Sequence, residues 1–242
     1  MNSSVDQKRA IITGASSGIG KATALALAKA GFKLALVGRS SERLESVAIA
    51  ARSLGAEVQV YVFDLLQLDQ VKAKFTAIAE ELGQVDILIN NAGMGYTGSL
   101  EATSLADWQQ VMNLNLTSVF QATLGVLPKM RAQQQGQIIN VSSIAAKTAF
   151  PGWGAYCVSK AALNTLSQAI AVEEKANNIR VTTIMPGAVN TPIWDTDTVD
   201  ADFDRTIMLT PDNIADSILQ IVQLPANANI EEITIAPSAG AL

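Results

Sequence analysis

The chain contains no histidine and only one cysteine, Cys157. Without histidine, a Ser-His-Asp or Cys-His catalytic set and a His-ligated zinc are both excluded. With one cysteine, an intramolecular disulfide and a multi-cysteine metal site are excluded as well. We therefore expect no metal site, and any reaction must use Tyr, Lys, Ser, Asp, Glu or Asn side chains or a bound cofactor. Cys157 itself is expected to be a small buried residue.

Charged residues are also few: they make up 16% of the 242 residues, whereas hydrophobic residues make up 49%. An average domain carries roughly 25% charged residues, and such a depletion is typical of a sheet covered by helices on both faces. The 17 basic and 22 acidic side chains give a net charge of −5. Proteins that bind nucleic acids are usually basic, so no nucleic-acid partner is expected.

Long apolar runs are missing too, because none approaches the roughly 18 residues of a membrane span. The polar segment Met1 to Lys8 is too short for a secretory signal. Both features predict a cytoplasmic protein without a membrane segment. No linker, composition break or repeat divides the chain, so we interpret residues 1–242 as one domain.

Short apolar runs, which indicate strands, alternate with longer helical patterns. Strands are expected at 9–13, 33–38, 57–63, 86–90, 137–142, 180–185 and 232–235. Helices are expected near 18–30, 41–54, 67–82, 104–133, 155–176 and 211–223. This alternation predicts an α/β protein with a parallel sheet between helices. Pro128 is expected to kink or shorten the longest helix.

A glycine-rich turn joins the first strand to the first helix. Gly14, Gly18 and Gly20 follow a G-x-x-x-G-x-G spacing, which differs from the usual G-x-G-x-x-G fingerprint. Such glycines let a phosphate approach the free N–H groups and the positive dipole end of the helix. The position of the turn between a strand and a helix favours a nucleotide site over a plain loop.

The next strands end in residues that suit a nucleotide as well. NAD sites usually place a carboxylate at the end of the second strand, where this chain has Gly38. Arg39 follows, and it could pair with a ribose 2′-phosphate or simply be a solvated surface residue. Asp64 and Leu65 follow the third strand, and residues 90–93 follow the fourth. Open α/β sheets bind ligands at these carboxyl ends.

Tyr156 and Lys160 are four residues apart at the start of a predicted helix, so they share one face. A phenol has a pKa near 10, and a neighbouring ammonium lowers it toward the range useful for proton transfer. Ser142 and Ser143 end the preceding strand, where a hydroxyl could bind a reacting carbonyl. Taken alone, a Tyr-x-x-x-Lys spacing is more often a coincidence on a helix surface.

Together these segments resemble the short-chain dehydrogenase/reductase family, from Arg9 to Ile235. The motifs that carry the resemblance, in order, are Thr13-Gly14-x-x-x-Gly18-x-Gly20, Asp64-Leu65, Asn90-Asn91-Ala92-Gly93, Asn115, Ser143, Tyr156-x-x-x-Lys160 and Pro186-Gly187-x-x-x-Thr191. The resemblance implies a doubly wound Rossmann fold with a seven-stranded parallel sheet and a nicotinamide cofactor. It also implies that Tyr156 transfers the proton and that Lys160 binds the nicotinamide ribose and lowers the pKa of the phenol. Ser143 would hold the substrate oxygen, and Asn115 would anchor a proton-relay water.

The same resemblance implies a set of cofactor-binding residues. They are Gly14, Ser16, Ser17, Gly18, Ile19, Gly20, Arg39, Asp64, Leu65, Asn91, Ala92, Gly93, Tyr156, Lys160, Pro186, Gly187, Val189 and Thr191. Arg39 without a preceding acid looks like the family's NADP-preferring pattern, so NADP(H) is the expected cofactor. Ser17 departs from a second such pattern, which carries a basic residue before the second glycine.

By the same resemblance, residues 191–207 form a lid over the substrate. The lid holds five Asp and one Arg, so its field would disfavour anions if it closes, although a solvated acidic loop is the alternative. We expect a neutral ketone or aldehyde, and the candidate contact residues are Ser143, Met94, Trp153, Trp194, Ile193 and Phe203. Trp153 is equally interpretable as a packing residue.

The expected activity is the NADP(H)-dependent reduction of a ketone or aldehyde, or the reverse oxidation. A 3-oxoacyl-carrier-protein reductase or a 3-hydroxy acid dehydrogenase is the alternative within the family. Residues 231–237 do not resemble the Gly-Gly ending common among the carrier-protein reductases. An epimerase or dehydratase would need a longer C-terminal region than the one after Pro186. A regulatory protein that binds NADP without turnover is the alternative of another class.

The helix that begins near Ala155 is apolar on nearly every side. One face would cover the sheet, and the other needs a partner because such a helix is rarely solvated. Members of the resembling family pair helices here, so a homodimer or homotetramer is expected.

Overall fold

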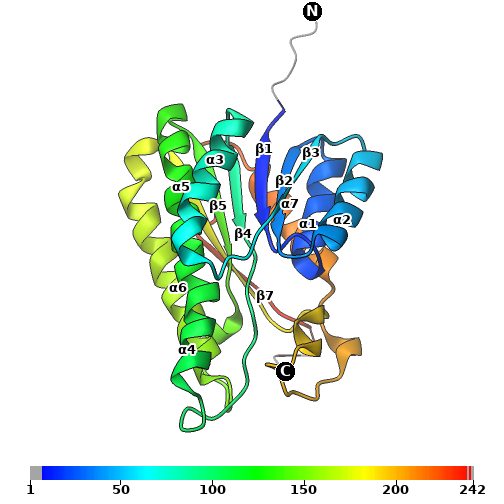
Figure 1. Ribbon diagram of the computed structural model, residues 1–242, viewed down its shortest axis with the longest axis vertical. Helices are drawn as coiled ribbons and strands as arrows, with labels where there is room; N and C mark the ends of the chain where they lie inside the picture. Colours follow the sequence, from blue (N-terminus) through cyan, green and yellow to red (C-terminus); the bar gives the residue numbers. More distant parts are fainter. Residues whose placement is uncertain (1–6, 239, 241–242) are drawn as a thin grey trace, which may run out of the picture.

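In the computed structural model, which describes residues 7–238 and 240, seven parallel strands form one sheet between two layers of helices (Figure 1). The strands are β1 (Arg9–Thr13), β2 (Lys33–Gly38), β3 (Val58–Val62), β4 (Ile87–Asn90), β5 (Gly136–Val141), β6 (Ile179–Pro186) and β7 (Glu232–Ile235). Their order across the sheet is β3-β2-β1-β4-β5-β6-β7. The predicted doubly wound α/β fold is confirmed.

The described part of the chain contains seven α-helices. They are α1 (Gly18–Lys29), α2 (Ser41–Ser53), α3 (Leu68–Leu82), α4 (Leu105–Met112), α5 (Ser118–Gln133), α6 (Gly154–Glu173) and α7 (Pro211–Val222). Helices α1, α2 and α7 pack on one face of the sheet, and α3, α5 and α6 pack on the other (Figure 1). Short polar side chains start several of them: Ser40 caps α2, Ser104 caps α4 and Thr210 caps α7.

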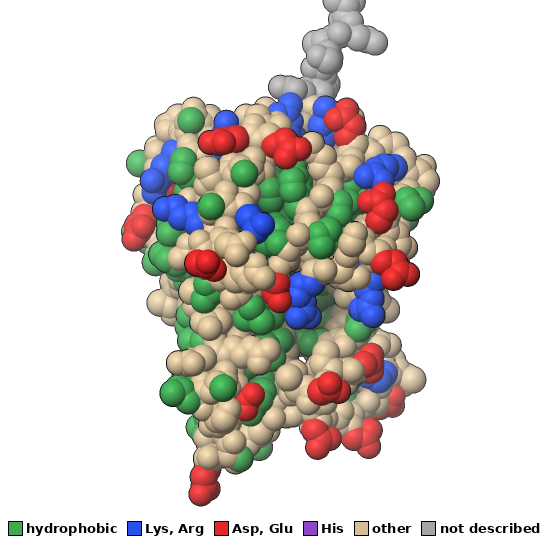
Figure 2. All heavy atoms as spheres, viewed as in Figure 1, with side chains coloured by type: hydrophobic (Ala, Val, Ile, Leu, Met, Phe, Trp, Pro, Cys, Tyr) green, Lys and Arg blue, Asp and Glu red, His purple; other side chains and the backbone are tan. Residues whose placement is uncertain are grey.

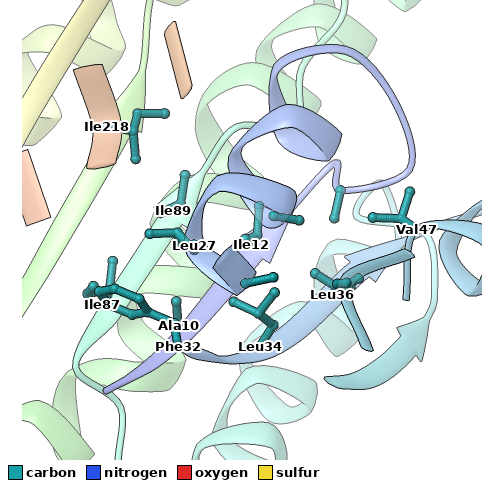
Figure 3. Packing of buried hydrophobic residues seen from close by; sticks show 14 of the residues in the cluster. Ala10, Ile12, Leu27, Phe32, Leu34, Leu36, Val47, Ile87, Ile89 and Ile218 are labelled. Atoms are coloured by element: carbon teal, nitrogen blue, oxygen red, sulfur yellow. The ribbon is translucent and has the colours of Figure 1, made fainter. Parts of the chain in front are cut away.

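Alternating side chains of each strand feed two separate cores. Ala10 and Ile12 of β1 point toward α1, α2 and α7, whereas Ile11 between them points toward α3 and α5. Figure 3 shows the first core, in which Ile12 lies near Leu27 of α1. Full burial of each such side chain contributes about 1.5–3 kcal/mol. Burial on both faces explains why so few charged residues are tolerated.

The order of the strands reverses between β1 and β4, which are neighbours in the sheet but not in the sequence. Connections on the two sides of this point turn away from each other, and a crevice opens at the carboxyl ends of the strands. The glycine-rich turn after β1, residues 91–98 after β4 and residues 142–153 after β5 all start at this edge of the sheet.

The helix predicted at 104–133 is wrong as one continuous element. It consists of α4 and α5 joined by a π-helical turn at Asn113–Thr117. A π-turn is a rare insertion confined to a single turn, too short a feature for the apolar periodicity of a long segment to reveal. Pro128 lies inside α5 and does not end it. Helix α6 ends at Glu173, and a separate 3-10 turn at Lys175–Asn177 follows it.

No helix among residues 7–238 and 240 is long and apolar enough to cross a bilayer. Most of the polar N-terminal segment considered above, from Met1 to Asp6, lies outside the described residues.

Candidate active site

The glycine-rich turn lies against the loop that follows β4. Gly14 has a φ of +64°, and a Cβ atom there would lie 2.9 Å from the Cα of Ala92. Only glycine allows both the backbone conformation and this approach. Ser17, the N-cap residue of α1, makes no side-chain capping bond, and the first turn of α1 holds no acidic residue. The N-terminus of α1 is therefore suited to a phosphate group.

Thr13 and Asn91 join these two loops. The Asn91 amide nitrogen donates to the carbonyls of Thr13, at 3.0 Å, and Gly14, at 3.3 Å. The Thr13 hydroxyl accepts from the backbone N–H groups of Asn91 and Ala92, both at 3.0 Å. The Asn91 side chain, predicted to bind the cofactor, is thus occupied in shaping the turn. Thr13 opens the motif that carries the family resemblance, but sequence analysis assigned no role to its hydroxyl.

The charged residues that follow β2 and β3 differ in whether they already have a partner within the protein. Gly38 is buried and Arg39 is exposed, and no carboxylate of the described residues forms an ion pair with Arg39. One oxygen of Asp64 accepts the backbone N–H of Leu66 at 3.0 Å, so this carboxylate shapes its own loop. Leu65 is buried beneath it. Arg39 therefore remains available to an anionic ligand.

The segment after β6 reaches back to α1. The Gly187 N–H donates to the carbonyl of Ile235 at 2.7 Å, and Val189 is buried. A Cβ atom at Gly18 would lie 3.1 Å from the Cγ2 of Thr191. Thr191, which follows the second half of the sheet, thus lies at the glycine-rich turn of the first half. The predicted cofactor residues of the glycine-rich turn and those of the segment after β6 therefore border the same crevice.

Ser143, Tyr156 and Lys160 come together at the end of β5. Helix α6 buries Lys160, which is 5% exposed, and its Nζ donates to the carbonyl of Val141 at 2.9 Å. The same Nζ lies 5.8 Å from the centroid of the Tyr156 ring. Ser143 lies close enough to Tyr156 for its side chain to lower the pKa of the phenol by hydrogen bonding. Two hydroxyls and one ammonium therefore line one small region.

Burial dominates the proton affinities of this group. It raises the pKa of Tyr156 to about 12, although the hydrogen bond with Ser143 lowers that pKa. It lowers the pKa of Lys160 to about 8, because the ammonium loses its hydration. The expected lowering of the phenol's pKa by Lys160 is not observed, since burial outweighs the other effects and Nζ is bonded to Val141. The phenol therefore holds its proton at neutral pH.

Asn115 is fully buried in the π-turn, and every hydrogen bond of its side chain is directed inward. Its Oδ1 accepts the N–H of Met94 at 2.8 Å. Its Nδ2 donates to the Met94 carbonyl and to the Ser159 hydroxyl, both at 3.0 Å. The Ser159 hydroxyl in turn donates to the carbonyl of Tyr156 at 2.7 Å. Ser159 was missed by sequence analysis, although its spacing from Tyr156 places it on the same turn of helix.

A series of aromatic rings starts at Tyr156. The Trp153 ring lies 5.5 Å from that of Tyr156, and the Trp194 ring lies 5.8 Å from Trp153. Phe203 continues the series, 5.4 Å from Trp194, and all three contacts are edge-to-face. The Trp194 indole N–H donates to the carbonyl of Val189 at 2.8 Å. Trp153 therefore connects the phenol with residues 192–207.

The acidic side chains of residues 192–207 are exposed to solvent. All five aspartates there are exposed, and Asp195 forms an ion pair with Arg205 at 2.9 Å. Figure 2 shows acidic side chains on the lower lobe, which carries this segment, and a hollow between that lobe and the body of the molecule. The charge of the segment therefore lies on the exposed surface of the molecule.

A parallel doubly wound sheet, a glycine-rich turn at the start of α1 and a Ser-Tyr-Lys group at the same edge of the sheet define a nucleotide-dependent oxidoreductase. The family model described as short chain dehydrogenase matches residues 8–201, and this chain belongs to that family.

Similar proteins agree with this membership. An uncharacterised oxidoreductase of Mycobacterium bovis is 40% identical over 95% of this chain and 68% of its own length. The crystal structure of an alcohol dehydrogenase of Thermococcus sibiricus, complexed with 5-hydroxy-NADP, matches with a TM-score of 0.89 and 29% identity, over 98% of this chain and 99% of the other. A metagenomic short-chain oxidoreductase in complex with NADP matches with a TM-score of 0.84 and 30% identity, over 96% of this chain and 97% of the other.

Proposed function

We propose that this protein reduces a neutral ketone or aldehyde with NADPH, or performs the reverse oxidation, and that Tyr156 transfers the proton. The observation that carries the proposal is the group formed by the buried Lys160 and the partly buried Ser143 and Tyr156. The group contains a proton donor, a second hydroxyl and a cation without histidine or metal.

The residues around the crevice suit NADP(H). The N-terminus of α1 would hold the pyrophosphate, and Arg39 would pair with the 2′-phosphate, helped by Ser16 and Ser17. Gly38 offers no carboxylate to a ribose 2′-hydroxyl, so NAD gains nothing there. Both related structures described above were solved with NADP or a derivative of it. When bound, the cofactor supplies the hydride that adds to the carbonyl carbon.

The protein's own part in the reaction is to orient the carbonyl and to supply the proton. The hydroxyls of Ser143 and Tyr156 would both bind the carbonyl oxygen, and the Tyr156 proton would pass to it as negative charge develops there. The raised pKa of Tyr156 keeps this proton in place at neutral pH. Lys160, whose pKa is lowered to about 8, can return a proton toward the phenol under the same conditions. Asn115 would anchor the water that connects this relay to solvent.

The surroundings of Tyr156 favour an uncharged, apolar substrate. Trp153 and Trp194 extend away from the phenol, and both are partly buried. The ammonium of Lys160 is already bonded to the carbonyl of Val141, and Arg205 is paired with Asp195. We propose that residues 191–207 form the substrate lid, with Ile193, Trp194 and Phe203 as its apolar contacts. A substrate carboxylate would find no partner among these residues.

The test is NADPH oxidation with a panel of ketones, aldehydes, keto acids and acyl thioesters, run on the wild type and on Tyr156→Phe. The variant should lose at least about 100-fold in kcat, because general acid catalysis contributes roughly 10²–10⁴-fold. Its Kd for NADPH, measured by fluorescence titration, should not change. Tyr61→Phe is the matched control, since Tyr61 lies on the edge strand β3 and bonds to Gln59.

The outcomes separate the alternatives. A Tyr156→Phe enzyme with more than about a tenth of the wild-type kcat would refute general acid catalysis by this residue. NADPH binding without turnover on the whole panel would favour a regulatory protein of the same fold.

A further inference from the structure

Three hydrogen bonds join the proposed lid to the loop between β4 and α4. The Thr97 N–H donates to the carbonyl of Thr198 at 2.9 Å, and the Thr198 hydroxyl donates to the carbonyl of Gly95 at 2.8 Å. The N–H of Asp200 donates to the Thr97 hydroxyl at 2.7 Å. We name this set, formed by Gly95, Thr97, Thr198 and Asp200, the latch.

Close packing accompanies the latch. Val199, between the two lid residues that bond, is buried. A Cβ atom at Gly95 would lie 2.7 Å from the Cγ2 of Val199, and 3.6 Å from both Ile193 Cγ1 and Trp153 Cζ3. The lid can lie this close to the loop only because residue 95 has no side chain. The latch therefore fixes Ile193 and Val199 beside Trp153, the residue that contacts Tyr156.

The loop that holds the lid also holds Asn115. Met94, directly before Gly95, exchanges two hydrogen bonds with the Asn115 amide, from its N–H at 2.8 Å and to its carbonyl at 3.0 Å. The other amide hydrogen bond of Asn115 leads through Ser159 to the backbone of Tyr156. A shift of residues 94–97 would therefore move both the proposed lid and the side chain of Asn115.

We propose that Thr97 is a positioning residue, which ties the closed lid to the loop that orients Asn115 and so couples substrate closure to the proton relay. The proposal rests on the proposed carbonyl reduction, and Thr97 acts through the lid and Asn115 without touching substrate. Lid closure excludes water from such sites and completes the arrangement of reacting groups. The Thr97 hydroxyl accepts the Asp200 N–H in the structure, and opening of the lid would break this bond, so removal of the hydroxyl should weaken the closed state selectively.

Thr97→Val tests this, because it preserves the shape of the side chain and removes the hydroxyl. We expect KM for the carbonyl substrate to rise about 2- to 10-fold, the value of one ordinary hydrogen bond. The Kd for NADPH and the Tm should not change. Thr97→Ser keeps the hydroxyl and should restore KM. Thr103→Val is the matched control, since its hydroxyl bonds to Ser99 in the same loop but outside the latch.

A second measurement does not depend on the substrate. Hydrogen–deuterium exchange of the NADPH-loaded protein should show faster exchange at residues 196–200 in Thr97→Val, and wild-type exchange in Thr97→Ser and Thr103→Val. Gly95→Ala should give the same fast exchange at residues 196–200, because its Cβ atom would clash with Val199. Adding Val199→Ala to Gly95→Ala should remove this clash and restore wild-type exchange. Unchanged exchange in Thr97→Val, or equal acceleration in Thr103→Val, would overturn the latch. If no carbonyl is reduced, the proposed function fails while the exchange result still decides on the latch.

Discussion

The Lys160 ammonium lies 5.8 Å from the centroid of the Tyr156 ring and donates a hydrogen bond to the carbonyl of Val141 at 2.9 Å. The chain therefore holds this cation near the phenol by a backbone carbonyl and not by a carboxylate. No carboxylate of residues 7–238 and 240 forms an ion pair with Lys160, and burial lowers its pKa to about 8. Burial raises the pKa of Tyr156 to about 12, so the two groups titrate far apart.

The pKa of Lys160 predicts a pH dependence of stability. The ordinary lysine value is 10.5, so between about pH 8 and 10.5 the unfolded chain binds more protons than the folded one. The free energy of unfolding contributed by Lys160 must therefore rise with pH in this window. Relative to Lys160→Met, which cannot titrate, the wild type should gain about 1.4 kcal/mol per pH unit.

Urea unfolding of both proteins without cofactor at pH 7, 8, 9 and 10 checks this prediction. Measurement stops at pH 10 because the raised pKa of Tyr156 acts with the opposite sign above that pH. A difference between the two proteins that stays constant from pH 8 to 10 would mean that Lys160 is not desolvated as the structure shows.

Arg39 predicts the choice of cofactor. Loss of a hydrogen bond to a charged group costs enough to reduce affinity about 10- to 100-fold. Arg39→Ala should therefore raise KM for NADPH by that factor and leave KM for NADH nearly unchanged. Arg43→Ala is the control, because Arg43 is an exposed arginine one helical turn further on. Equal losses with both cofactors would remove Arg39 from the 2′-phosphate site.

The sequence predicted the strands and the grouping of Ser143, Tyr156 and Lys160 well, because both depend on local patterns. Apolar runs bounded by polar turns mark strands, and parallel strands bring their carboxyl ends to one edge. Family resemblance then supplied the roles. Asn115 was found in this way, but not the π-turn that buries it, since a single turn of π-helix is too short a feature for periodicity to reveal.

Other features could not be predicted because they depend on contacts distant in sequence. Thr97 bonds to residues about a hundred positions away, and nothing near Thr97 indicates that pairing. The raised pKa of Tyr156 likewise depends on burial by several elements, whereas the spacing from Lys160 alone predicts a lowered value. Residues that act through tertiary contacts are thus the ones that the sequence left unassigned.

The outer face of α6 predicts self-association. Val158 is 43% and Val172 is 78% exposed on this helix, and Phe120 of α5, in the same layer, is 40% exposed. A charge introduced there should oppose the burial of this face against a second copy. We expect Val172→Glu and Phe120→Glu to shift the mass measured by light scattering to that of one chain. Ile49→Glu, on an exposed position of α2 in the opposite layer, is the control.

A wild-type mass of one chain, or an oligomer unaffected by both substitutions, would contradict this assignment of the interface. The Tm of each variant should be measured as well, because an exposed position should tolerate the charge without a loss of the fold.

The acidic lid predicts discrimination against a substrate carried on an acidic protein. All five of its aspartates are exposed, so they act at the entrance through long-range fields that salt screens over about 10 Å at 0.1 M. An acyl carrier protein is acidic and should dock poorly, whereas a neutral ketone should be unaffected. We therefore expect kcat/KM to be higher for neutral ketones than for a carrier-bound 3-oxoacyl thioester at low salt, with the difference decreasing as salt is added.

Neutralising part of the lid sharpens the test. Asp197 and Asp202 form no ion pair with the described residues, so Asp197→Asn with Asp202→Asn removes charge without breaking one. The double variant should raise kcat/KM for the carrier-bound thioester at low salt and leave that for a neutral ketone unchanged. Because steering changes encounter rates, the gain should disappear at high salt. A wild-type preference for the carrier-bound substrate at low salt would refute both the charge argument and the neutral substrate.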